Sequence, residues 1–326
     1  METAFSRNGQ VWSIILAGGE GTRLTSMVKK WLGQALPKQY CAFVGTRSMF
    51  QHTLDRAQQV SFPDHTVTVI ARSHGEYALP QFGHRASGIV LIQPENRDTA
   101  AGIFLPLTYI RTRSPHAIVS IYPSDHFIYP EAPFVDAVHQ ATWTVQRFPD
   151  RLVLLGIAPD HTELQYGWIQ PAEELEHVAG YSVRAVESFL EKPTRTEALA
   201  AQNSGALWNT FVMVVKASTL WELGWRCVPE IMPLFDKLSR AIGTSQEGHI
   251  LDMIYQQMPK RNFSFDLLQK IPNRIAVIEV KGVLWSDWGH PERVVSTLRK
   301  IGKVPRFPEH LVEVGESSQA VHELSK

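Results

Sequence analysis

The stretch VWSIILAGGEGTRL, residues 11–24, joins an apolar run to a glycine-rich turn. Residues 11–16 are apolar and rich in β-branched side chains, which predicts a buried strand. The glycines that follow let backbone N–H groups approach an oxyanion without obstruction by a Cβ atom, and the guanidinium of Arg23 suits phosphate. The pattern therefore favours a phosphate-binding loop, with a flexible β-turn as the alternative.

The spacing of this loop excludes two well-known phosphate-binding motifs. The Gly-Lys-Ser/Thr sequence of a P-loop is absent, and Gly19 and Gly21 are not followed by the third glycine of a dinucleotide fingerprint. The loop therefore indicates another kind of phosphate chemistry.

Composition narrows the class of protein. The chain has 326 residues, enough for a large buried core, and its 32 Lys and Arg balance its 32 Asp and Glu. No net field attracts nucleic acid or an anionic membrane. Cys41 and Cys227 are too few for a disulfide framework or a zinc site. The first ten residues lack the long apolar core of a signal peptide, and no apolar run approaches the roughly 20 residues of a membrane span. We expect a soluble cytoplasmic protein that binds small-molecule substrates, without nucleic-acid or membrane partners, and a homo-oligomer is left open.

Strand-like and helix-like segments alternate along the first half. Apolar strands are predicted at 66–71, 88–92, 117–122 and 152–157, and helices at 48–60, 98–109 and 134–147, the first with Ser48 as its N-cap. A further strand is predicted at 275–280 and a closing helix at 291–300. This alternation predicts an α/β fold with a doubly wound, mostly parallel sheet and helices on both faces.

Two aspartates follow predicted strands that are far apart in the sequence. Asp125 comes just after the strand at 117–122, and Asp287 follows the strand at 275–280. The carboxyl ends of parallel strands share one edge of a sheet, where open α/β folds bind ligands. Carboxylates and phosphate oxygens suit Mg²⁺, so Asp125 and Asp287 are candidate metal ligands. The alternative for Asp287 is a turn-forming role before Gly289.

Further blocks appear in the order that a known family shows. After LAGGEGTRL and Pro37-Lys38-Gln39, the chain resembles the sugar-1-phosphate nucleotidyltransferases, and most closely their mannose-1-phosphate guanylyltransferase branch. The matching blocks are QPENRDTA (93–100), PSDHFI (123–128), YGWIQ (166–170), FLEKP (189–193), LWN (207–209) and WSDWG (285–289). The resemblance implies a Rossmann-like fold of the GT-A nucleotidyltransferase type.

The resemblance also implies a set of site residues. The catalytic set is Arg23, Lys38, Asp125 and Asp287, with Mg²⁺ on the two aspartates. The nucleotide-binding set is Leu16, Ala17, Gly18, Gly19, Gly21, Thr22, Gln93, Asn96, Arg97 and Thr99. For Lys38 alone a solvated surface position is the alternative, and for Gln93, Asn96 and Arg97 a capping or loop role is an equal alternative.

The sugar-phosphate set implied by the resemblance lies in the second half. It comprises Tyr166, Gly167, Glu191, Lys192 and Asn209. The alternative for the aromatic Tyr166 is a place in the core, and the alternative for Glu191 and Lys192 is a surface ion pair before a turn. The chain departs from the family pattern at two places. Thr210-Phe211 stands where Ser-Gly is usual, and Gln269 stands where Glu is usual.

The expected reaction is transfer of a nucleotidyl group from a nucleoside triphosphate to a sugar 1-phosphate with release of pyrophosphate. GTP and mannose 1-phosphate are the expected substrates, and GDP-mannose is the expected product. The rivals are thymidylyl or uridylyl transfer to glucose 1-phosphate and a non-catalytic regulatory homologue. We expect one domain at 10–300, with a nucleotide half at about 10–160 and a sugar-phosphate half at about 161–300, and a short polar tail at 301–326.

Overall fold

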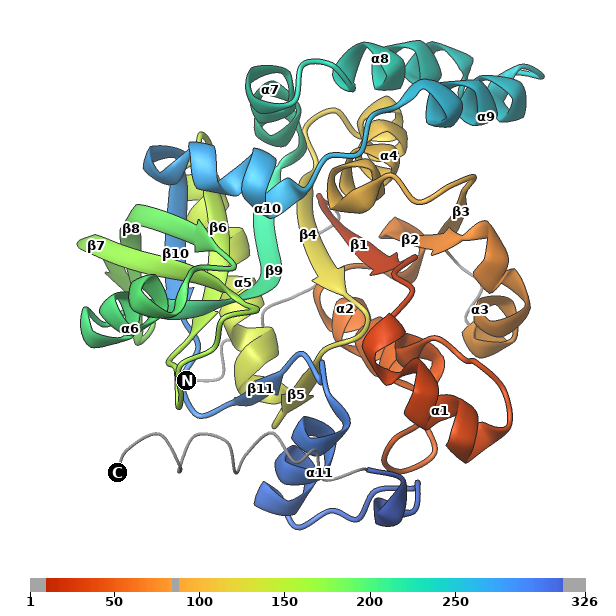
Figure 1. Ribbon diagram of the computed structural model, residues 1–326. Coiled ribbons are helices and arrows are strands. Elements are labelled where there is room, and N and C mark those ends of the chain that lie inside the picture. Colours follow the sequence, from red (N-terminus) through yellow and green to blue (C-terminus); the bar gives the residue numbers. More distant parts are fainter. Residues whose placement is uncertain (1–9, 84–87, 313–326) are drawn as a thin grey trace.

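A 9-stranded sheet runs through the computed structural model, which describes residues 10–83 and 88–312 (Figure 1). The strand order is β3-β2-β1-β4-β9-β6-β10-β8-β7. The strands are β1 (Val11–Ala17), β2 (Thr66–Ala71), β3 (Ile89–Gln93), β4 (Ile118–Pro123), β6 (Leu152–Ile157), β7 (Gly167–Val178), β8 (Tyr181–Glu191), β9 (Leu207–Lys216) and β10 (Ile275–Glu279).

Most of these strands point the same way. β1 pairs in parallel with β2 and β4, β2 with β3, and β6 with β10. Only β8 and β9 run against the others, because each pairs antiparallel with all of its neighbours. The predicted fold class is confirmed. β9 lies between β4 and β6, so the two halves of the chain contribute to one sheet.

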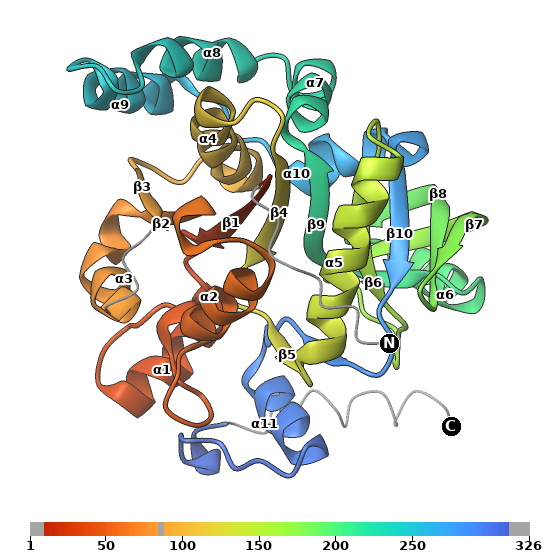
Figure 2. The ribbon, with the colours of Figure 1, turned by 180° about the vertical axis from the view of Figure 1, so that it is seen from behind.

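Helices cover both faces of the sheet, as predicted. The face seen in Figure 2 carries α2 (Met49–Val60), α5 (Ala132–Arg147) and α6 (Arg195–Asn203). The opposite face carries α4 (Asp98–Arg113), α7 (Ala217–Cys227), α8 (Met232–Ala241), α9 (Glu247–Gln257) and α10 (Phe263–Asp266). The apolar strands supply side chains to both cores because alternate residues point to opposite faces.

Several predicted boundaries match the structure closely. β2, β6 and α11 (Pro291–Lys300) span the predicted residues, and Ser48 caps α2 in a capping box with Gln51. α4 continues beyond the predicted end at residue 109 to Arg113. Pro106 lies inside the predicted range and does not end the helix, because residues 100–110 are buried and tertiary packing outweighs the local penalty of a proline.

A third core lies below the carboxyl edge of β1 and β4. Here α1 (Thr25–Leu32) and α11 pack around Trp288 and Phe43, beside a small sheet formed by β5 (Phe127–Tyr129) and β11 (Leu284–Ser286) (Figure 1). The segment at 25–36 therefore includes a packed helix, α1, with buried Met27 and Val28.

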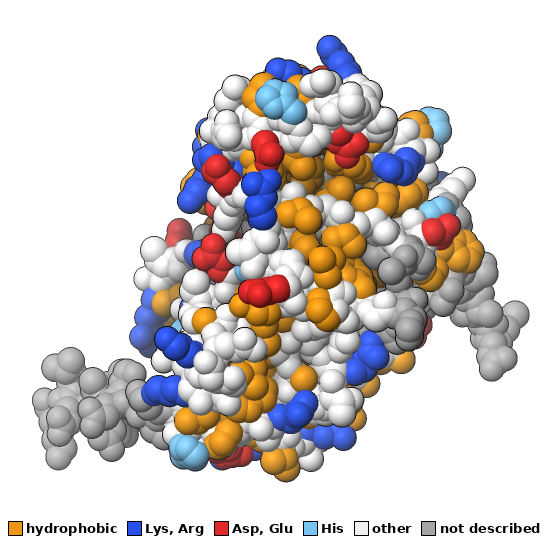
Figure 3. Space-filling view, turned by 90° about the vertical axis from the view of Figure 1, so that its right-hand side faces the viewer, with side chains coloured by type: hydrophobic (Ala, Val, Ile, Leu, Met, Phe, Trp, Pro, Cys, Tyr) orange, Lys and Arg blue, Asp and Glu red, His pale blue; other side chains and the backbone are white. Residues whose placement is uncertain are grey.

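Both signs of charge occur on the face that carries α1, α3 (Gly75–Phe82) and β3 (Figure 3). Figure 3 shows basic and acidic side chains interspersed there, with hydrophobic side chains between them. In the part of the chain that the structure describes, no helix has the length and apolar character needed to cross a lipid bilayer.

Candidate active site

The glycine loop is tied to the segment that carries Lys38. Gly21 has φ +59°, and a Cβ atom there would lie 3.0 Å from Cβ of Lys38, so only glycine allows this close approach. The carbonyl of Ala17, at the end of β1, accepts hydrogen bonds from Nε2 of Gln39 (3.0 Å) and the hydroxyl of Tyr40 (2.8 Å). The loop therefore positions Lys38.

Lys38 joins the two predicted metal ligands. Its Nζ lies 3.0 Å from Oδ2 of Asp125 and also donates a hydrogen bond to the main-chain carbonyl of Asp287. Lys38 is only 4% exposed. Asp125 follows β4 and Asp287 follows β11, so the structure brings together residues that lie far apart in the sequence. The alternative of a solvated surface lysine does not apply to Lys38.

The Asp287 carboxylate has partners on both oxygens. Arg23 Nη2 lies 3.1 Å from Oδ2, while Arg293 Nη1 lies 2.7 Å from Oδ1. The Tyr166 hydroxyl donates to Oδ1 at 2.8 Å. Arg23, which is half-exposed, also donates to the side chain of Gln165. All four predicted catalytic residues therefore form one cluster.

Arg293 is a member of this cluster that the sequence did not reveal. It lies in the first turn of α11, and its second nitrogen pairs with the nearly buried Glu163. The available signal was a basic residue shortly after the WSDWG block, in a predicted helix. The contact with Glu163 depends on folding, because the two residues lie far apart in the sequence.

Electrostatics keep both aspartates ionised. Burial alone would raise the pKa of Asp125, but the charges of Lys38 and His126 outweigh it and hold the pKa below its usual range. Burial acts on Asp287 in the same way, and the charges of Lys38 and Arg293 hold its pKa well below the usual range. The cluster therefore presents two carboxylates to a cation.

Two adjoining cavities open beside the cluster. One of about 350 Å³ has six of the predicted nucleotide residues among those that line it, and the other, of about 370 Å³, is lined by Arg23, Asp125, Asp287 and all five predicted sugar-phosphate residues. The cavities share Leu16, Gly19 and Thr99. The arrangement has room for two ligands, one in each cavity, on opposite sides of the glycine loop. The predicted nucleotide residues in the first cavity, besides these three, are Gly18, Gln93 and Asn96.

The predicted nucleotide residues differ in how they are held. Gln93 is buried, and its Nε2 donates to the hydroxyl of Tyr255 at 3.1 Å. Thr99 accepts a hydrogen bond from the backbone of Phe263. Asn96 accepts from the backbone N–H of Asp98 at 2.9 Å, which is the loop role offered as the alternative.

Four predicted nucleotide residues line neither cavity. Arg97 pairs with Glu95 at 2.6 Å and donates to the carbonyl of Gln256. Ala17, Gly21 and Thr22 belong to the end of β1 and the turn after it, where they shape the loop. Their assigned contacts with nucleotide stay predictions.

Among the predicted sugar-phosphate residues, Gly167 of β7 lies close to Glu191 of β8. A Cβ atom on Gly167 would lie 2.9 Å from Phe189 and 3.1 Å from Oε2 of Glu191, so glycine is required there. Burial raises the pKa of Glu191, and the neighbouring ammonium of Lys192 opposes this shift. Lys192 has φ +48° and is exposed. Tyr166 packs against two tryptophans and supports Asp287, while still lining the cavity.

Both departures from the family pattern contact this region. Gln269 accepts a hydrogen bond from the backbone N–H of Glu191 at 3.1 Å. Phe211 lines the second cavity with φ +59°, a conformation that favours glycine.

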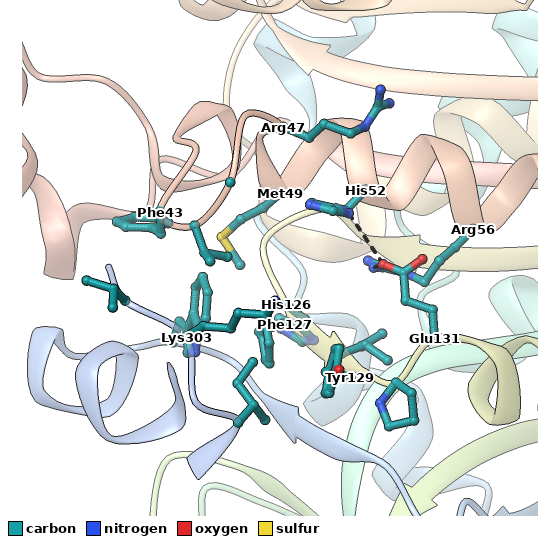
Figure 4. Close-up of a pocket in the computed structure, with 17 residues that line it drawn as sticks. Phe43, Arg47, Met49, His52, Arg56, His126, Phe127, Tyr129, Glu131 and Lys303 are labelled. Atoms are coloured by element: carbon teal, nitrogen blue, oxygen red, sulfur yellow. Dashed lines mark hydrogen bonds and ion pairs between the residues drawn. The ribbon is translucent and has the colours of Figure 1, made fainter. Parts of the chain in front are cut away.

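A larger cavity of about 640 Å³ lies on the other side of His126 (Figure 4). Its walls include Phe43, Phe127 and Trp288, and Figure 4 shows the His52 side chain directed at Glu131 near its rim. None of the predicted site residues lines this cavity.

Similarity to known proteins agrees with this geometry. The sequence profile described as Nucleotidyl transferase matches residues 12–303, so the chain belongs to the nucleotidyl transferase family. It is 29% identical over 292 residues to the xanthan biosynthesis protein XanB of Xanthomonas campestris, covering 86% of this chain and 57% of that protein. It is 24% identical over 296 residues to a mannose-1-phosphate guanylyltransferase of Escherichia coli, covering 89% of this chain and 61% of that protein. The chain therefore spans little more than half the length of these relatives.

Solved structures show the same fold. A protein of Thermus thermophilus described as mannose-1-phosphate geranyltransferase superposes with a TM-score of 0.74 at 24% identity, covering 88% of this chain and 79% of that one. A putative glucose-1-phosphate thymidylyltransferase of Bacillus anthracis gives 0.55 at 13% identity, covering 92% and 98%. At these identities the likeness supports the fold alone.

Proposed function

We propose that this protein transfers a nucleotidyl group from a nucleoside triphosphate to a sugar 1-phosphate and releases pyrophosphate. The observation that carries the proposal is the contact of Lys38 with both Asp125 and Asp287, beside Arg23 and under the glycine loop. Opposite charges gathered at a cavity edge suit a reaction between two phosphate groups.

In the proposed reaction, an oxygen of the sugar phosphate attacks the α-phosphorus in line. The bond between the α-phosphorus and the bridging oxygen breaks, and that oxygen leaves with pyrophosphate. Positioning and charge neutralisation supply most of the rate in such transfers. Arg23 is exposed enough to turn from Asp287 toward the triphosphate, while Lys192 lies at the sugar-phosphate side for the acceptor phosphate.

Lys38 acts in this scheme through the two aspartates. Its ammonium is buried between the two aspartates and lines neither cavity. It is therefore better placed to hold Asp125 and Asp287 than to contact the leaving group directly, and its charge still lowers the negative potential at the reacting phosphates.

The residues present fit a magnesium ion. Mg²⁺ is usually held by one or two carboxylates together with waters and substrate phosphates, and within the described ranges no group of three or more His, Cys, Asp or Glu competes as a closed metal site. Oδ1 of Asp125 lies 3.7 Å from Nε2 of His126, beyond hydrogen-bond distance, whereas Asp287 would have to exchange its contact with Arg23. When bound there, Mg²⁺ would neutralise charge on the phosphates.

GTP and mannose 1-phosphate are the substrates we propose. The block pattern and the name of the Escherichia coli relative support this choice. We assign the nucleotide to the half at about 10–160 and the sugar phosphate to the half at about 161–300. Thymidylyl or uridylyl transfer to glucose 1-phosphate is the second candidate, supported by the departure at Phe211, which changes the wall of the sugar cavity.

A non-catalytic regulatory homologue would have no need for a charged centre. Loss of the metal and phosphate ligands would cost such a protein nothing, yet Arg23, Lys38, Asp125 and Asp287 are all present and in contact. This favours catalysis.

Turnover measured across GTP, dTTP, UTP and CTP with several sugar 1-phosphates tests the proposal. We expect Mg²⁺-dependent pyrophosphate release, fastest with GTP and mannose 1-phosphate. Faster turnover of dTTP or UTP with glucose 1-phosphate would support the second candidate. Binding of a nucleotide sugar without turnover of any pair would support the regulatory alternative.

A further inference from the structure

Strand β9 carries a bulge beside the sugar-phosphate cavity. Leu154 of β6 pairs with Met213, and Gly156 pairs with Asn209, so residues 210–212 lie opposite Leu155 alone. Extra residues in one strand redirect a side chain, and such bulges are common next to active sites. Here the bulge is centred on Phe211.

The backbone of the bulge is held in an unusual conformation. Phe211 has φ +59°, which is rare for a bulky side chain. Its N–H donates to Oδ1 of Asn209 at 3.0 Å, and Thr210 bonds through its hydroxyl to the carbonyl of Leu155 at 2.7 Å. The N–H of Val212 donates to the same hydroxyl at 3.2 Å. These bonds fix a conformation that would otherwise relax, as strained residues at functional sites are fixed by their surroundings.

The aromatic side chain lies at the wall of the cavity. Phe211 lines it together with Glu191, Lys192 and Asn209, and it is half-buried. Its ring meets the buried ring of Phe263 edge-on, with centroids 6.3 Å apart. The ring is therefore supported from behind and does not fill the core.

The bulge is also connected to the catalytic cluster. The carbonyl of Thr210 lies 3.1 Å from Nδ1 of His126, which follows Asp125 directly. Phe211 and both aspartates line the same cavity.

We propose that Phe211 is a specificity-determining residue for the sugar 1-phosphate. Its ring forms an apolar wall that accepts the C–H face of a pyranose and excludes sugars with a bulky substituent on that face. This inference rests on the proposed function, because it names the acceptor class of the same site. An aromatic wall contacts C–H groups favourably, but it leaves a hydroxyl or amide pressed against it without a hydrogen-bond partner.

The test compares Phe211→Gly and Phe211→Ala with the wild-type protein. Glycine suits the positive φ, so Phe211→Gly keeps the bulge, and Phe211→Ala shows whether glycine itself disturbs it. The panel holds mannose 1-phosphate, glucose 1-phosphate and N-acetylglucosamine 1-phosphate, each with the nucleotide that the wild type prefers. We expect kcat/KM for N-acetylglucosamine 1-phosphate, relative to the hexose phosphates, to rise about tenfold or more in both variants. The KM for the nucleotide should stay within about twofold, as expected for a site that contacts only the acceptor.

The matched control is Phe62→Ala, since Phe62 is 38% exposed and lines neither substrate cavity. It should leave every ratio unchanged. An unchanged acceptor ratio in both Phe211 variants, or a change confined to the KM of the nucleotide, would overturn the assignment.

Calorimetric binding of the three sugar phosphates gives a second readout that needs no turnover. If the wild type shows no transfer, the proposed function fails. The Phe211 proposal is then tested by binding alone. A gain in the affinity of Phe211→Gly for N-acetylglucosamine 1-phosphate, relative to the hexose phosphates, would support it, and no gain would contradict it.

Discussion

The ammonium of Lys38 lies 3.0 Å from Oδ2 of Asp125, in a position where the lysine is 4% exposed. A buried lysine carries its charge at such a site only when it is paired, so the two residues depend on one another. The same ammonium reaches the backbone of Asp287. Removal of Lys38 therefore affects both halves of the proposed metal site.

Lys38→Met should reduce turnover by about 10²–10³, the usual cost of losing one preorganised charged contact. It should also lower the free energy of unfolding by about 1–3 kcal/mol, since Asp125 keeps some solvent but loses its main partner. Initial rates of pyrophosphate release and urea denaturation measure the two effects. Lys281→Met, at an 81% exposed position, is the control. Wild-type rates in Lys38→Met would show that the buried contact is irrelevant to turnover.

Arg293 should act as a positioning residue through Asp287. Arg293→Gln removes the 2.7 Å contact with Oδ1 and the pairing with Glu163, while Arg23 still contacts the other oxygen. We expect kcat to fall about tenfold with little change in the KM of either substrate, because Arg293 lines neither substrate cavity. In a double-mutant cycle, Arg293→Gln should have almost no further effect once Asp287 is changed to Asn. Additive losses in that cycle would assign Arg293 a separate role.

Glu191 should link stability to pH. Burial raises its pKa above the ordinary value of 4.5, so the folded state disfavours the ionised form. At neutral pH this costs stability, and the cost disappears as the pH falls through the folded pKa toward 4.5. Glu191→Gln should therefore unfold at higher urea concentration than wild type at pH 7, with a difference that shrinks toward pH 4. A difference that grows on acidification would contradict the direction of the shift.

Gln93, at the end of β3, and Arg97, just before α4, should differ in their effect on the nucleotide. Gln93 lines the first cavity and is fixed by Tyr255, whereas Arg97 is paired with Glu95 and lines neither cavity. Gln93→Ala should raise the KM for the nucleoside triphosphate by about tenfold, the effect of one lost hydrogen bond in a buried site. Arg97→Ala should leave it within about twofold. Steady-state kinetics with varied nucleotide measure the KM of each variant. A larger rise in KM for Arg97→Ala than for Gln93→Ala would contradict this prediction and place Arg97 in the nucleotide site.

The sequence predicted those features that depend on local pattern. Apolar runs followed by polar residues located β2, β4 and β6, and Asp125 follows β4 as expected. Asp287 follows β11 of the small two-stranded sheet and not β10 directly, so its place beside Asp125 depends on the pairing of β11 with β5. The glycines at 18, 19 and 21 marked the turn after β1, where Gly21 has a positive φ. These signals are read from short stretches, because strand period and glycine geometry are local properties.

Other features depend on pairing between distant segments. The contact of Arg293 with Glu163 requires α11 to dock beside the start of β7, and the φ of Phe211 follows from the register of β9 against β6. Tyr166 supports Asp287 because both meet in the fold, a role that its aromatic block did not indicate. Side-chain contacts of this kind arise from tertiary packing, which overrides local preference.

The most direct test of the central claim measures pyrophosphate release by wild type, Asp125→Asn and Asp287→Asn, with GTP, mannose 1-phosphate and varied Mg²⁺. Circular dichroism and urea denaturation establish that each variant is folded. The account predicts metal-dependent turnover in the wild type and a loss of at least about 10² in each folded variant. A folded variant of either aspartate with wild-type turnover and unchanged Mg²⁺ dependence would contradict it.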